Sequence, residues 1–188
     1  PWKQPKNCTV IMSGTVKDET IKLVDELFGR DWLSAGEITE NDFHFSQGPG
    51  IEHYIEKPEA LQSAIRIGQV AINRTHADFP GLQVLNTILG GYFGSRLMAN
   101  IREDKGYTYG IGSALISLKS TGYFFIASEV GADVCTSAME EIQKEIDTLK
   151  HQPVSTEELS LVRNYMLGSM LGSLENALSH ADKFKNIY

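Results

Sequence analysis

The sequence predicts an α+β fold in which helices pack on one face of a mixed, largely antiparallel sheet. Segments with strand-like alternation are interleaved with segments of helical periodicity, which favours this class. Two strand-like segments near the middle are separated by only two residues, as in a hairpin. The 188 residues suffice for one domain of ordinary size, so we expect a single domain over residues 1–188.

The N-terminal third is expected to open as a strand followed by a helix. Residues 7–12 (NCTVIM) are rich in β-branched side chains, which favour a short strand. Residues 18–28 change to a helical period and are followed by glycine, a common stop signal. Residues 30–50 show no clear period and predict a long connection, whereas residues 51–56 alternate as a strand does.

The middle third contains the clearest elements. Residues 63–74 predict a longer strand, and residues 79–89 and 95–104 predict two helices, each followed closely by glycine. Residues 107–118 and 121–130 predict adjacent strands, and the two polar residues between them suit a tight turn. These two strands are therefore expected to form an antiparallel hairpin.

The C-terminal third is expected to be helical. Asp133 precedes a strongly amphipathic segment over residues 134–149 and is expected to cap that helix. Ser155 and Glu158 have the spacing of a capping box, which predicts the start of a long helix. Residues 177–188 are compatible with one more helix.

The charge balance excludes two classes of partner. Seventeen Lys and Arg residues stand against 24 Asp and Glu residues, a net charge of −7. Nucleic-acid binders and proteins that dock on anionic lipid concentrate positive charge, so we expect neither partner. No apolar run approaches the roughly 18 residues that a bilayer span needs, so we expect no membrane insertion.

The histidines do not form a recognisable metal motif. No two of them have the i, i+4 spacing that places both imidazoles on one helix face, and HExxH is absent. The reversed motif HxxEH is nearly present as His53-Tyr-Ile-Glu56-Lys57. A lysine ammonium repels zinc and offers no lone pair, and the segment alternates like a strand. We therefore expect no metal site and no cofactor site in this chain.

Arg102 and Tyr109 are the one pair of residues whose types and spacing indicate a role in ligand binding or catalysis. Arg102 falls in the last turns of a predicted helix that Gly106 ends, and Tyr109 lies seven residues later on the emerging strand. A guanidinium donates to carbonyl or carboxylate oxygens in a planar fork, and a phenol donates to an oxyanion. On spacing alone the alternative stays open that Arg102 pairs with Glu103 or Asp104 on the surface and that Tyr109 is a half-buried strand residue.

The stretch around these two residues resembles the non-catalytic domain of the pitrilysin / mitochondrial processing peptidase family of zinc metallopeptidases, the inverzincins. In that family a glycine pair, SRL, IRE and Gly-x-x-Tyr recur in this order. The matching segments of this sequence are NCTVIMSGTV with LVDELFG, GQVAINRTHADFPGLQVLNTILGG, GSRLMANIREDKGYTYGIGS and EIDTLKHQPVSTEELSLVRNYM. The resemblance extends over nearly the whole chain.

The resemblance implies specific roles. Proteins of the family are built from paired α+β domains around a closed chamber, in which one domain carries HxxEH and zinc. The facing domain carries an arginine and a tyrosine, which correspond to Arg102 and Tyr109 here. Tyr109 would donate to the oxyanion that forms on the scissile carbonyl, and Arg102 would hold a main-chain carbonyl of the substrate. Tyr107 shares a strand face with Tyr109 by period 2, but it stands where the family more often has an aliphatic residue.

The resemblance therefore implies a substrate-binding, catalysis-assisting domain of a zinc-dependent endopeptidase. It would be inactive alone because HxxEH is absent, and zinc is expected in a sister domain or separate subunit that bears that motif. We expect the chain to be a fragment of a longer multidomain peptidase whose upstream zinc domain is missing, and the isolated fragment could form a homodimer. The alternatives are a structural or assembly subunit without proteolytic role and, less favoured, a small-molecule enzyme that uses the glycine loop at residues 90–94.

Overall fold

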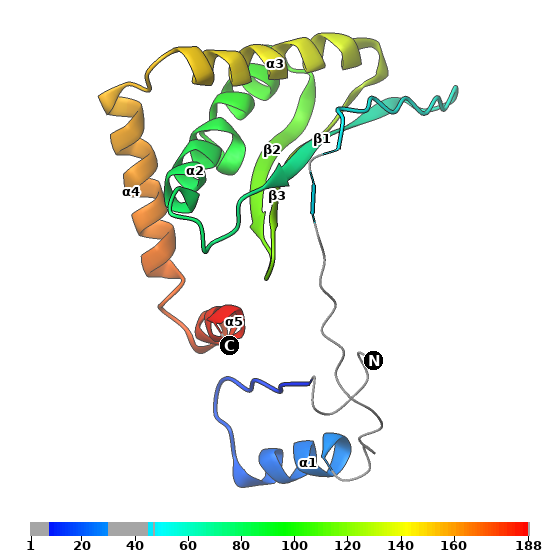
Figure 1. Cartoon of the computed structure of the whole chain (residues 1–188). Coiled ribbons are helices and arrows are strands. Elements are labelled where there is room, and N and C mark those ends of the chain that lie inside the picture. The colour runs from blue at the N-terminus through cyan, green and yellow to red at the C-terminus, as the bar shows by residue number, and fades with distance from the viewer. Residues whose placement is uncertain (1–7, 30–44, 47, 188) are drawn as a thin grey trace. The chain divides into compact units, whose positions relative to one another are not determined.

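The computed structural model describes residues 8–29, 45–46 and 48–187 (Figure 1). The chain divides into two compact units, one within residues 1–42 and 165–188 and the other within residues 43–164. The first unit contains helices α1 (Asp18–Phe28) and α5 (Ala177–Ile187), and helix α4 (Thr156–Gly172) begins in the second unit and ends in the first. Among the described residues, no helix has the length and apolar character needed to cross a membrane.

The second unit contains a three-stranded antiparallel sheet in the order β1-β3-β2. Its strands are β1 (Gln62–Ala71), β2 (Thr108–Ser117) and β3 (Gly122–Gly131). The predicted hairpin is β2 and β3, and Leu118 N donates to Thr121 O at 2.8 Å across its turn. A Cβ at Gly122 would lie 2.3 Å from the carbonyl oxygen of Ile72, so the close approach of the chains requires glycine there.

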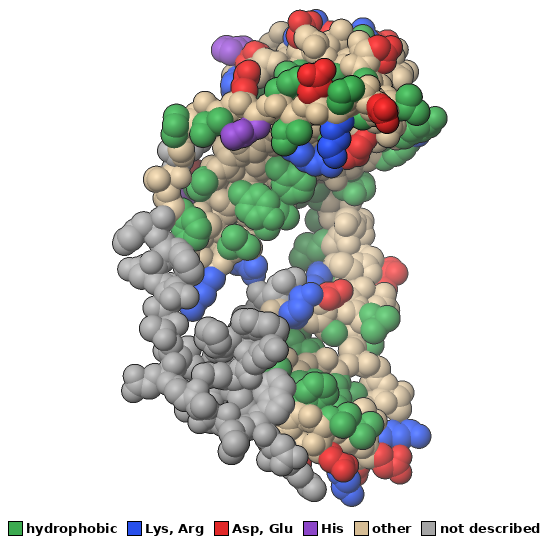
Figure 2. Space-filling model, turned by 90° about the vertical axis from the view of Figure 1, so that its right-hand side faces the viewer, with side chains coloured by type: hydrophobic (Ala, Val, Ile, Leu, Met, Phe, Trp, Pro, Cys, Tyr) green, Lys and Arg blue, Asp and Glu red, His purple; other side chains and the backbone are tan. Residues whose placement is uncertain are grey.

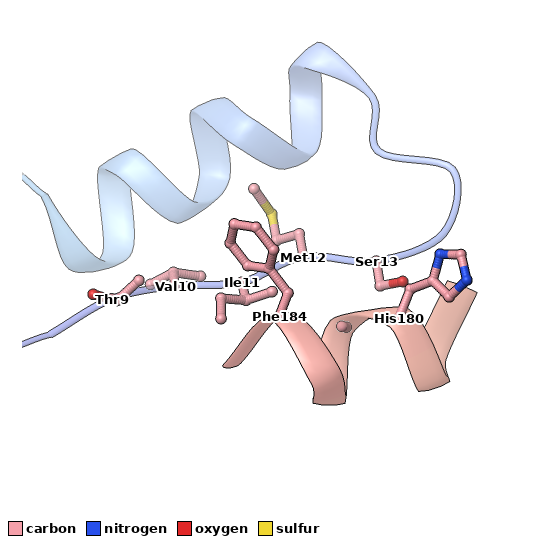
Figure 3. Close-up of a pocket in the computed structure, with 8 residues that line it drawn as sticks. Thr9, Val10, Ile11, Met12, Ser13, His180 and Phe184 are labelled. Atoms are coloured by element: carbon pink, nitrogen blue, oxygen red, sulfur yellow. The ribbon is translucent and has the colours of Figure 1, made fainter. Parts of the chain in front are cut away.

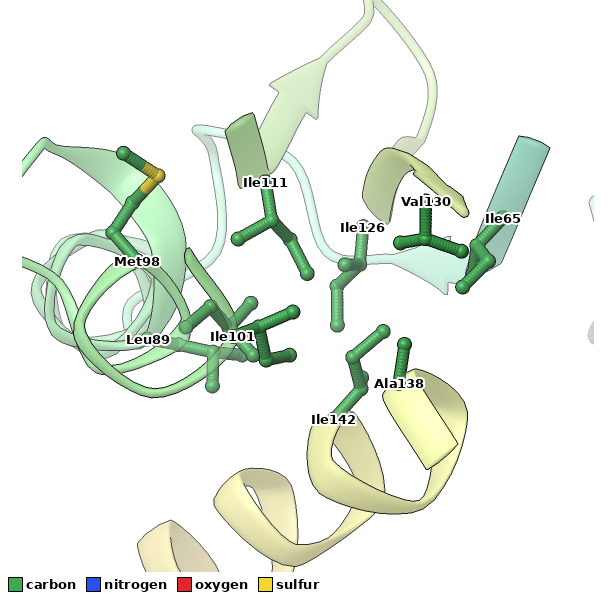
Figure 4. Close-up of a cluster of buried hydrophobic side chains, with 10 residues drawn as sticks. Ile65, Leu89, Met98, Ile101, Ile111, Ile126, Val130, Ala138 and Ile142 are labelled. Atoms are coloured by element: carbon green, nitrogen blue, oxygen red, sulfur yellow. The ribbon is translucent and has the colours of Figure 1, made fainter. Parts of the chain in front are cut away.

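Helices cover one face of this sheet. Helix α2 (Phe79–Asn86) continues into the wider, π-helical segment η2 (Thr87–Gly91), and a second π-helical segment, η3 (Met98–Asp104), precedes β2. Helix α3 (Cys135–His151) follows β3. Figure 4 shows Ile126 and Val130 of the sheet pointing toward Ile142 and Ala138 of α3, with Ile101 of η3 beside them. The predicted α+β class, with helices on one face of an antiparallel sheet, is confirmed.

The shared core fixes the segment that carries the candidate residues. Ile101, Ile126, Val130 and Ile142 are fully buried, and Ile111 of β2 is 5% exposed. Burial of side chains of this size contributes about 1.5–3 kcal/mol each. Because η3 and β2 are both anchored in this core, the chain between them, which includes Gly106, is held at both ends.

Two predicted strands are not strands in the structure. Residues 8–12 and 51–56 have no regular secondary structure, although both sequences are typical of strands. A strand needs a neighbour to satisfy its backbone hydrogen-bonding groups. Among the described residues neither segment pairs with another strand. Most of the expected connection over residues 30–50 lies outside the described residues.

The helix starts were predicted with mixed success. Helix α3 begins at Cys135, and its N-cap residue is Val134, without a side-chain cap. Asp133 lies one residue before that position, within a short 3₁₀ turn (Ala132–Val134), so the predicted Asp133 cap is wrong. At α4 half of the predicted capping box is present, since Glu158 N donates to Ser155 Oγ at 3.1 Å. The Glu158 carboxylate does not return to Ser155; it accepts two hydrogen bonds from Arg96, each 2.8 Å long. Two charge-assisted bonds outweigh the single bond of a capping box.

The outer side of α3 carries charges of both signs. Lys144 pairs with Glu141 and Lys150 with Asp147, each pair three residues apart on the helix. Figure 2 shows acidic and basic side chains interspersed around α3, at the top of the view. Such i, i+3 pairs of opposite charge are favourable on an exposed helix face and are weakened by salt.

Candidate functional site

Tyr109 lies on an irregular stretch of β2. Thr108 pairs with Val130 and Ile111 pairs with Ser128, so three steps on β2 match two steps on β3, which defines a β-bulge at Tyr109 and Gly110. The Tyr109 side chain is 93% exposed. Among the described residues its hydroxyl has no hydrogen-bond partner. A bulge redirects a side chain out of the regular alternation, so Tyr109 is presented to solvent with its donor free.

The hydroxyls of Thr108, which is half-buried, and Ser128, which is buried, brace this bulge. Thr108 Oγ1 donates to the Glu129 carbonyl oxygen at 2.6 Å and accepts from Gly110 N at 3.1 Å. Ser128, which is 1% exposed, places its Oγ 3.0 Å from both Thr108 Oγ1 and Gly110 O. The backbone on both sides of Tyr109 is therefore held by hydrogen bonds. Because the backbone is already ordered, only the side chain of Tyr109 has to lose conformational freedom when it binds a ligand.

Tyr107 differs from Tyr109 in its surroundings. It precedes β2, its N–H donates to Ile101 O at 3.0 Å, and its side chain packs against the hydrophobic core. The expectation that the two tyrosines share one strand face is wrong, because the period-2 rule applies only within a regular strand. Of the two, Tyr109 is the more exposed, since Tyr107 is only half-exposed.

Arg102 lies near the end of η3, whose backbone is wider than an α-helix. Lys105 N donates to Asn100 O at 2.9 Å, an i to i−5 bond, and Gly106 then adopts φ +67°, so that the chain turns toward β2. Ile101, directly before Arg102, is fully buried. Because neighbouring helical residues point in different directions, anchoring Ile101 in the core directs Arg102 away from it, and Arg102 is half-buried.

The guanidinium of Arg102 rests on an aromatic ring instead of a carboxylate. Its Cζ atom lies 4.7 Å from the centroid of the Phe93 ring. Among the described residues, Arg102 makes no ion pair with Glu103, Asp104 or any other acid. Asp104 pairs with Lys105 at 2.8 Å, and this hydrogen bond raises the pKa of the Lys105 ammonium. The alternative of a surface ion pair for Arg102 therefore has no support in this structure.

A hollow beside Tyr109 has a volume of about 580 Å³. It is bordered by the turn from η3 into β2, by the start of β1 and by the end of β3 with the 3₁₀ turn that follows. Its lining residues are Leu61, Gln62, Lys105, Gly106, Tyr107, Thr108, Tyr109, Glu129, Gly131, Asp133 and Val134. Arg102 is not among its lining residues. The structure thus presents both predicted residues outside the core, but places only Tyr109 at this hollow.

A second hollow, of about 520 Å³, lies in the first unit and contains neither predicted residue. Figure 3 shows the extended segment from Thr9 to Ser13 running along α5, with His180 and Phe184 projecting toward it. Ser13 Oγ donates to the carbonyl oxygen of Ala177 and so ties the two segments together. The hollow therefore marks packing within this unit.

Zinc does not fit the residues that the structure describes. His53, Glu56 and Lys57 lie in a segment without helical structure, so they cannot project from one helix face as HxxEH requires. Throughout the described ranges, no group of three or more His, Cys, Asp or Glu side chains is placed to hold a metal ion.

Sequence reasoning missed the residues that act through contacts between distant segments. Phe93 was noted only as part of a glycine-rich loop, and Ser128 only as a position in a strand. The bidentate pair of Arg96 with Glu158 joins the segment before η3 to α4 across 62 positions. The only sequence signal for Ser128 was its type, a polar residue at a position of β3 that faces the core.

Comparisons with known proteins agree on one family. A model of the peptidase M16 inactive domain matches residues 2–166. The Bacillus subtilis protein named "uncharacterized zinc protease YmxG" is 31% identical over 178 residues, which is 93% of this chain and 42% of that protein. A second B. subtilis protein, "probable inactive metalloprotease YmfF", is 24% identical and covers 82% of this chain and 35% of its own length.

Solved structures show the same fold. The peptidase M16 inactive domain from Pseudomonas fluorescens superposes with a TM-score of 0.67 at 25% identity, covering 83% of this chain and 38% of that one. A protease from Helicobacter pylori superposes with a TM-score of 0.75 at 18% identity, covering 97% and 45%. The chain therefore spans less than half the length of each of these relatives.

Proposed function

The chain belongs to the family of peptidase M16 inactive domains, and from this premise we propose that it binds peptide substrate and assists catalysis in a zinc-dependent peptidase. In this proposal Tyr109 and Arg102 are the residues that reach the substrate. The observation that carries the proposal is that both side chains lie outside the core with their donors unused by any described residue, one on a braced bulge and one on an aromatic ring.

Tyr109 is proposed to stabilise the transition state. Its hydroxyl donates a hydrogen bond to the oxyanion that develops on the scissile carbonyl. A hydrogen-bond donor that is already in position stabilises the transition state most when charge forms on its acceptor, because the site then needs little reorganisation. The brace by Thr108 and Ser128 supports this role, since it holds the backbone on either side of Tyr109.

Arg102 is proposed to bind the substrate main chain. Its N–H groups offer a planar fork to a carbonyl oxygen near the scissile bond. This contact would exist in the bound substrate and in the transition state alike. Loss of Arg102 is therefore expected to raise KM more than it lowers kcat.

The chain is proposed to be inactive alone. It lacks HxxEH, and zinc is assigned to a sister domain or partner subunit that carries this motif. The relative named as a zinc protease is more than twice the length of this chain, which leaves room for such a domain. Hydrolysis would require both domains, and the residues here would bind and orient the peptide.

The replacement of Tyr109 by phenylalanine tests the proposal in the complete peptidase, with the zinc domain present. Tyr109→Phe keeps the ring and removes one donor, so kcat should fall by about 10²–10³-fold while KM changes little. Tyr123→Phe is the matched control, because this exposed tyrosine of β3 does not line the hollow, and loss of its hydroxyl should leave kcat unchanged. Unchanged turnover in Tyr109→Phe would show that the proposed role is wrong.

A second candidate is a structural or assembly subunit that has kept the fold without proteolysis. The similarity to a relative named as an inactive metalloprotease favours it. The two candidates differ in one observable. If neither the full-length protein nor its partner subunit contains HxxEH and the complete assembly cleaves no peptide from a random library, the structural role is correct.

A further inference from the structure

Phe93 is an exposed aromatic residue with one specific contact. The side chain is 64% exposed, although a phenylalanine ring gains free energy from burial. Its face lies under the Arg102 guanidinium, with 4.7 Å between the ring centroid and Cζ, inside the roughly 6 Å range of cation–π attraction. The contact joins the turn after η2 to the end of η3.

We propose that Phe93 is the positioning residue for Arg102, which it holds by the face of the guanidinium so that the in-plane N–H donors stay available to substrate. The inference rests on the proposed function of Arg102. It adds a residue that touches no substrate itself and acts only through Arg102. The ligand class is the peptide main chain, because a free planar fork matches carbonyl oxygens.

A ring suits this task better than a carboxylate would. A carboxylate partner accepts hydrogen bonds from the same edge of the guanidinium that substrate would use, and it neutralises the charge. Neighbouring cations show that arrangement, since Arg96 is bound by Glu158 and Lys105 by Asp104. Arg102 has no acidic partner among the described residues. An aromatic face attracts the cation and leaves its edge free.

The backbone holds the ring in place. Ser95 N donates to Tyr92 O at 3.1 Å and closes a tight turn that carries Phe93. Ser95 and Leu97, directly after this turn, are 1% and 0% exposed. A Cβ at Gly94 would lie 2.8 Å from the Tyr92 ring, so the turn is closely packed on itself. Both Phe93 and Arg102 therefore project from segments anchored in the core.

Kinetics of the complete peptidase test the proposal. Phe93→Leu keeps an apolar side chain but loses the ring, and an exposed cation–π contact of typical strength corresponds to about a two- to fivefold rise in KM with kcat nearly unchanged. Phe93→Tyr retains a π face and should restore the wild-type KM. Tyr54→Leu, which removes another exposed ring, is the matched control and should leave KM unchanged.

A double-mutant cycle distinguishes the role of Phe93 from the role of Arg102. If Phe93 acts through Arg102, Phe93→Leu combined with Arg102→Gln should raise KM no further than Arg102→Gln alone. If Arg102→Gln raises KM but Phe93→Leu does not, or if the two effects multiply, the inference on Phe93 is overturned and the proposed function stands. If Arg102→Gln leaves KM unchanged, the proposed role of Arg102 is itself wrong.

The contact can also be observed without activity. In the NMR spectrum of this chain, the ring of Phe93 should shift the Arg102 side-chain resonances upfield. Phe93→Leu should return them toward their values in an unstructured peptide, whereas Phe93→Tyr should preserve them. Resonances of Arg102 that are identical in the wild type and in Phe93→Leu would contradict the proposed contact directly.

Discussion

Gly106 occupies the left-handed backbone region, with φ +67°, at the turn between Arg102 and Tyr109. A Cβ there would meet no atom within 4 Å, so the demand for glycine is conformational and not steric crowding by neighbours. Gly106→Ala should lower the free energy of unfolding by about 1–2 kcal/mol, measured by urea denaturation. The control is Gly81→Ala, at an uncrowded helical position in α2, which should keep or raise stability. Equal effects of both substitutions would show that the left-handed backbone at Gly106 does not require glycine.

At the same scale, the sequence identifies residues through their types and their spacing. Arg102 and Tyr109 were found because they stand in a family pattern seven positions apart, although their roles stay predictions. Phe93 could not be found in this way. Its contact with Arg102 depends on where η2 and η3 end, and the widening of both helical segments is not encoded in any periodicity of apolar residues.

At the scale of elements, long periodic segments were predictable and their ends were less so. Helix α1 has the predicted bounds, because its apolar stripe is bordered by an acidic first turn and a glycine. The start of α4 shows why caps are harder to predict. Ser155 caps the helix as expected, but Glu158 is diverted to Arg96, a partner 62 positions away that no local pattern reveals.

The pair of Arg96 with Glu158 should make stability depend on pH. The hydrogen bond from Arg96, against some desolvation, lowers the pKa of the Glu158 carboxyl below its ordinary 4.5. A lowered folded-state pKa stabilises the fold above the ordinary value, and that stabilisation is lost as the pH falls through the lowered value. Glu158→Gln should therefore lower the free energy of unfolding by about 1–2 kcal/mol at pH 7. Its difference from the wild type should become smaller below about pH 4.5.

Urea denaturation at pH 7 and near pH 3 measures this difference. Glu157→Gln is the control, since its exposed carboxylate lies next to Glu158 in the same first turn, and it should change stability by at most about 0.5 kcal/mol. A Glu158→Gln effect that stays the same at both pH values would show that the ion pair does not contribute through its charge.

At the scale of the whole molecule, the sequence predicted the fold class but not every strand. The alternation in residues 51–56 is real, yet a strand forms only where a second strand offers its backbone groups. Within the described residues no such neighbour is present for it. Pairing is a property of the assembled sheet, which a single segment does not encode, whereas the β2–β3 hairpin could be predicted because its partners are adjacent in sequence.

The proposed assignment of zinc to a second domain or subunit predicts how metal removal should act. A chelator should abolish peptide cleavage by the complete peptidase, yet leave the thermal unfolding midpoint of this chain unchanged, because no three or more His, Cys, Asp or Glu side chains of the described residues are placed together to hold a metal ion. If the chain did bind zinc, a zinc concentration of a hundred times Kd would raise its free energy of unfolding by about 2.7 kcal/mol. At roughly 2–4 °C per kcal/mol, scanning calorimetry would then show a rise of about 5–11 °C. A shift of that size on adding zinc to the isolated chain would place a metal site in it and refute this assignment.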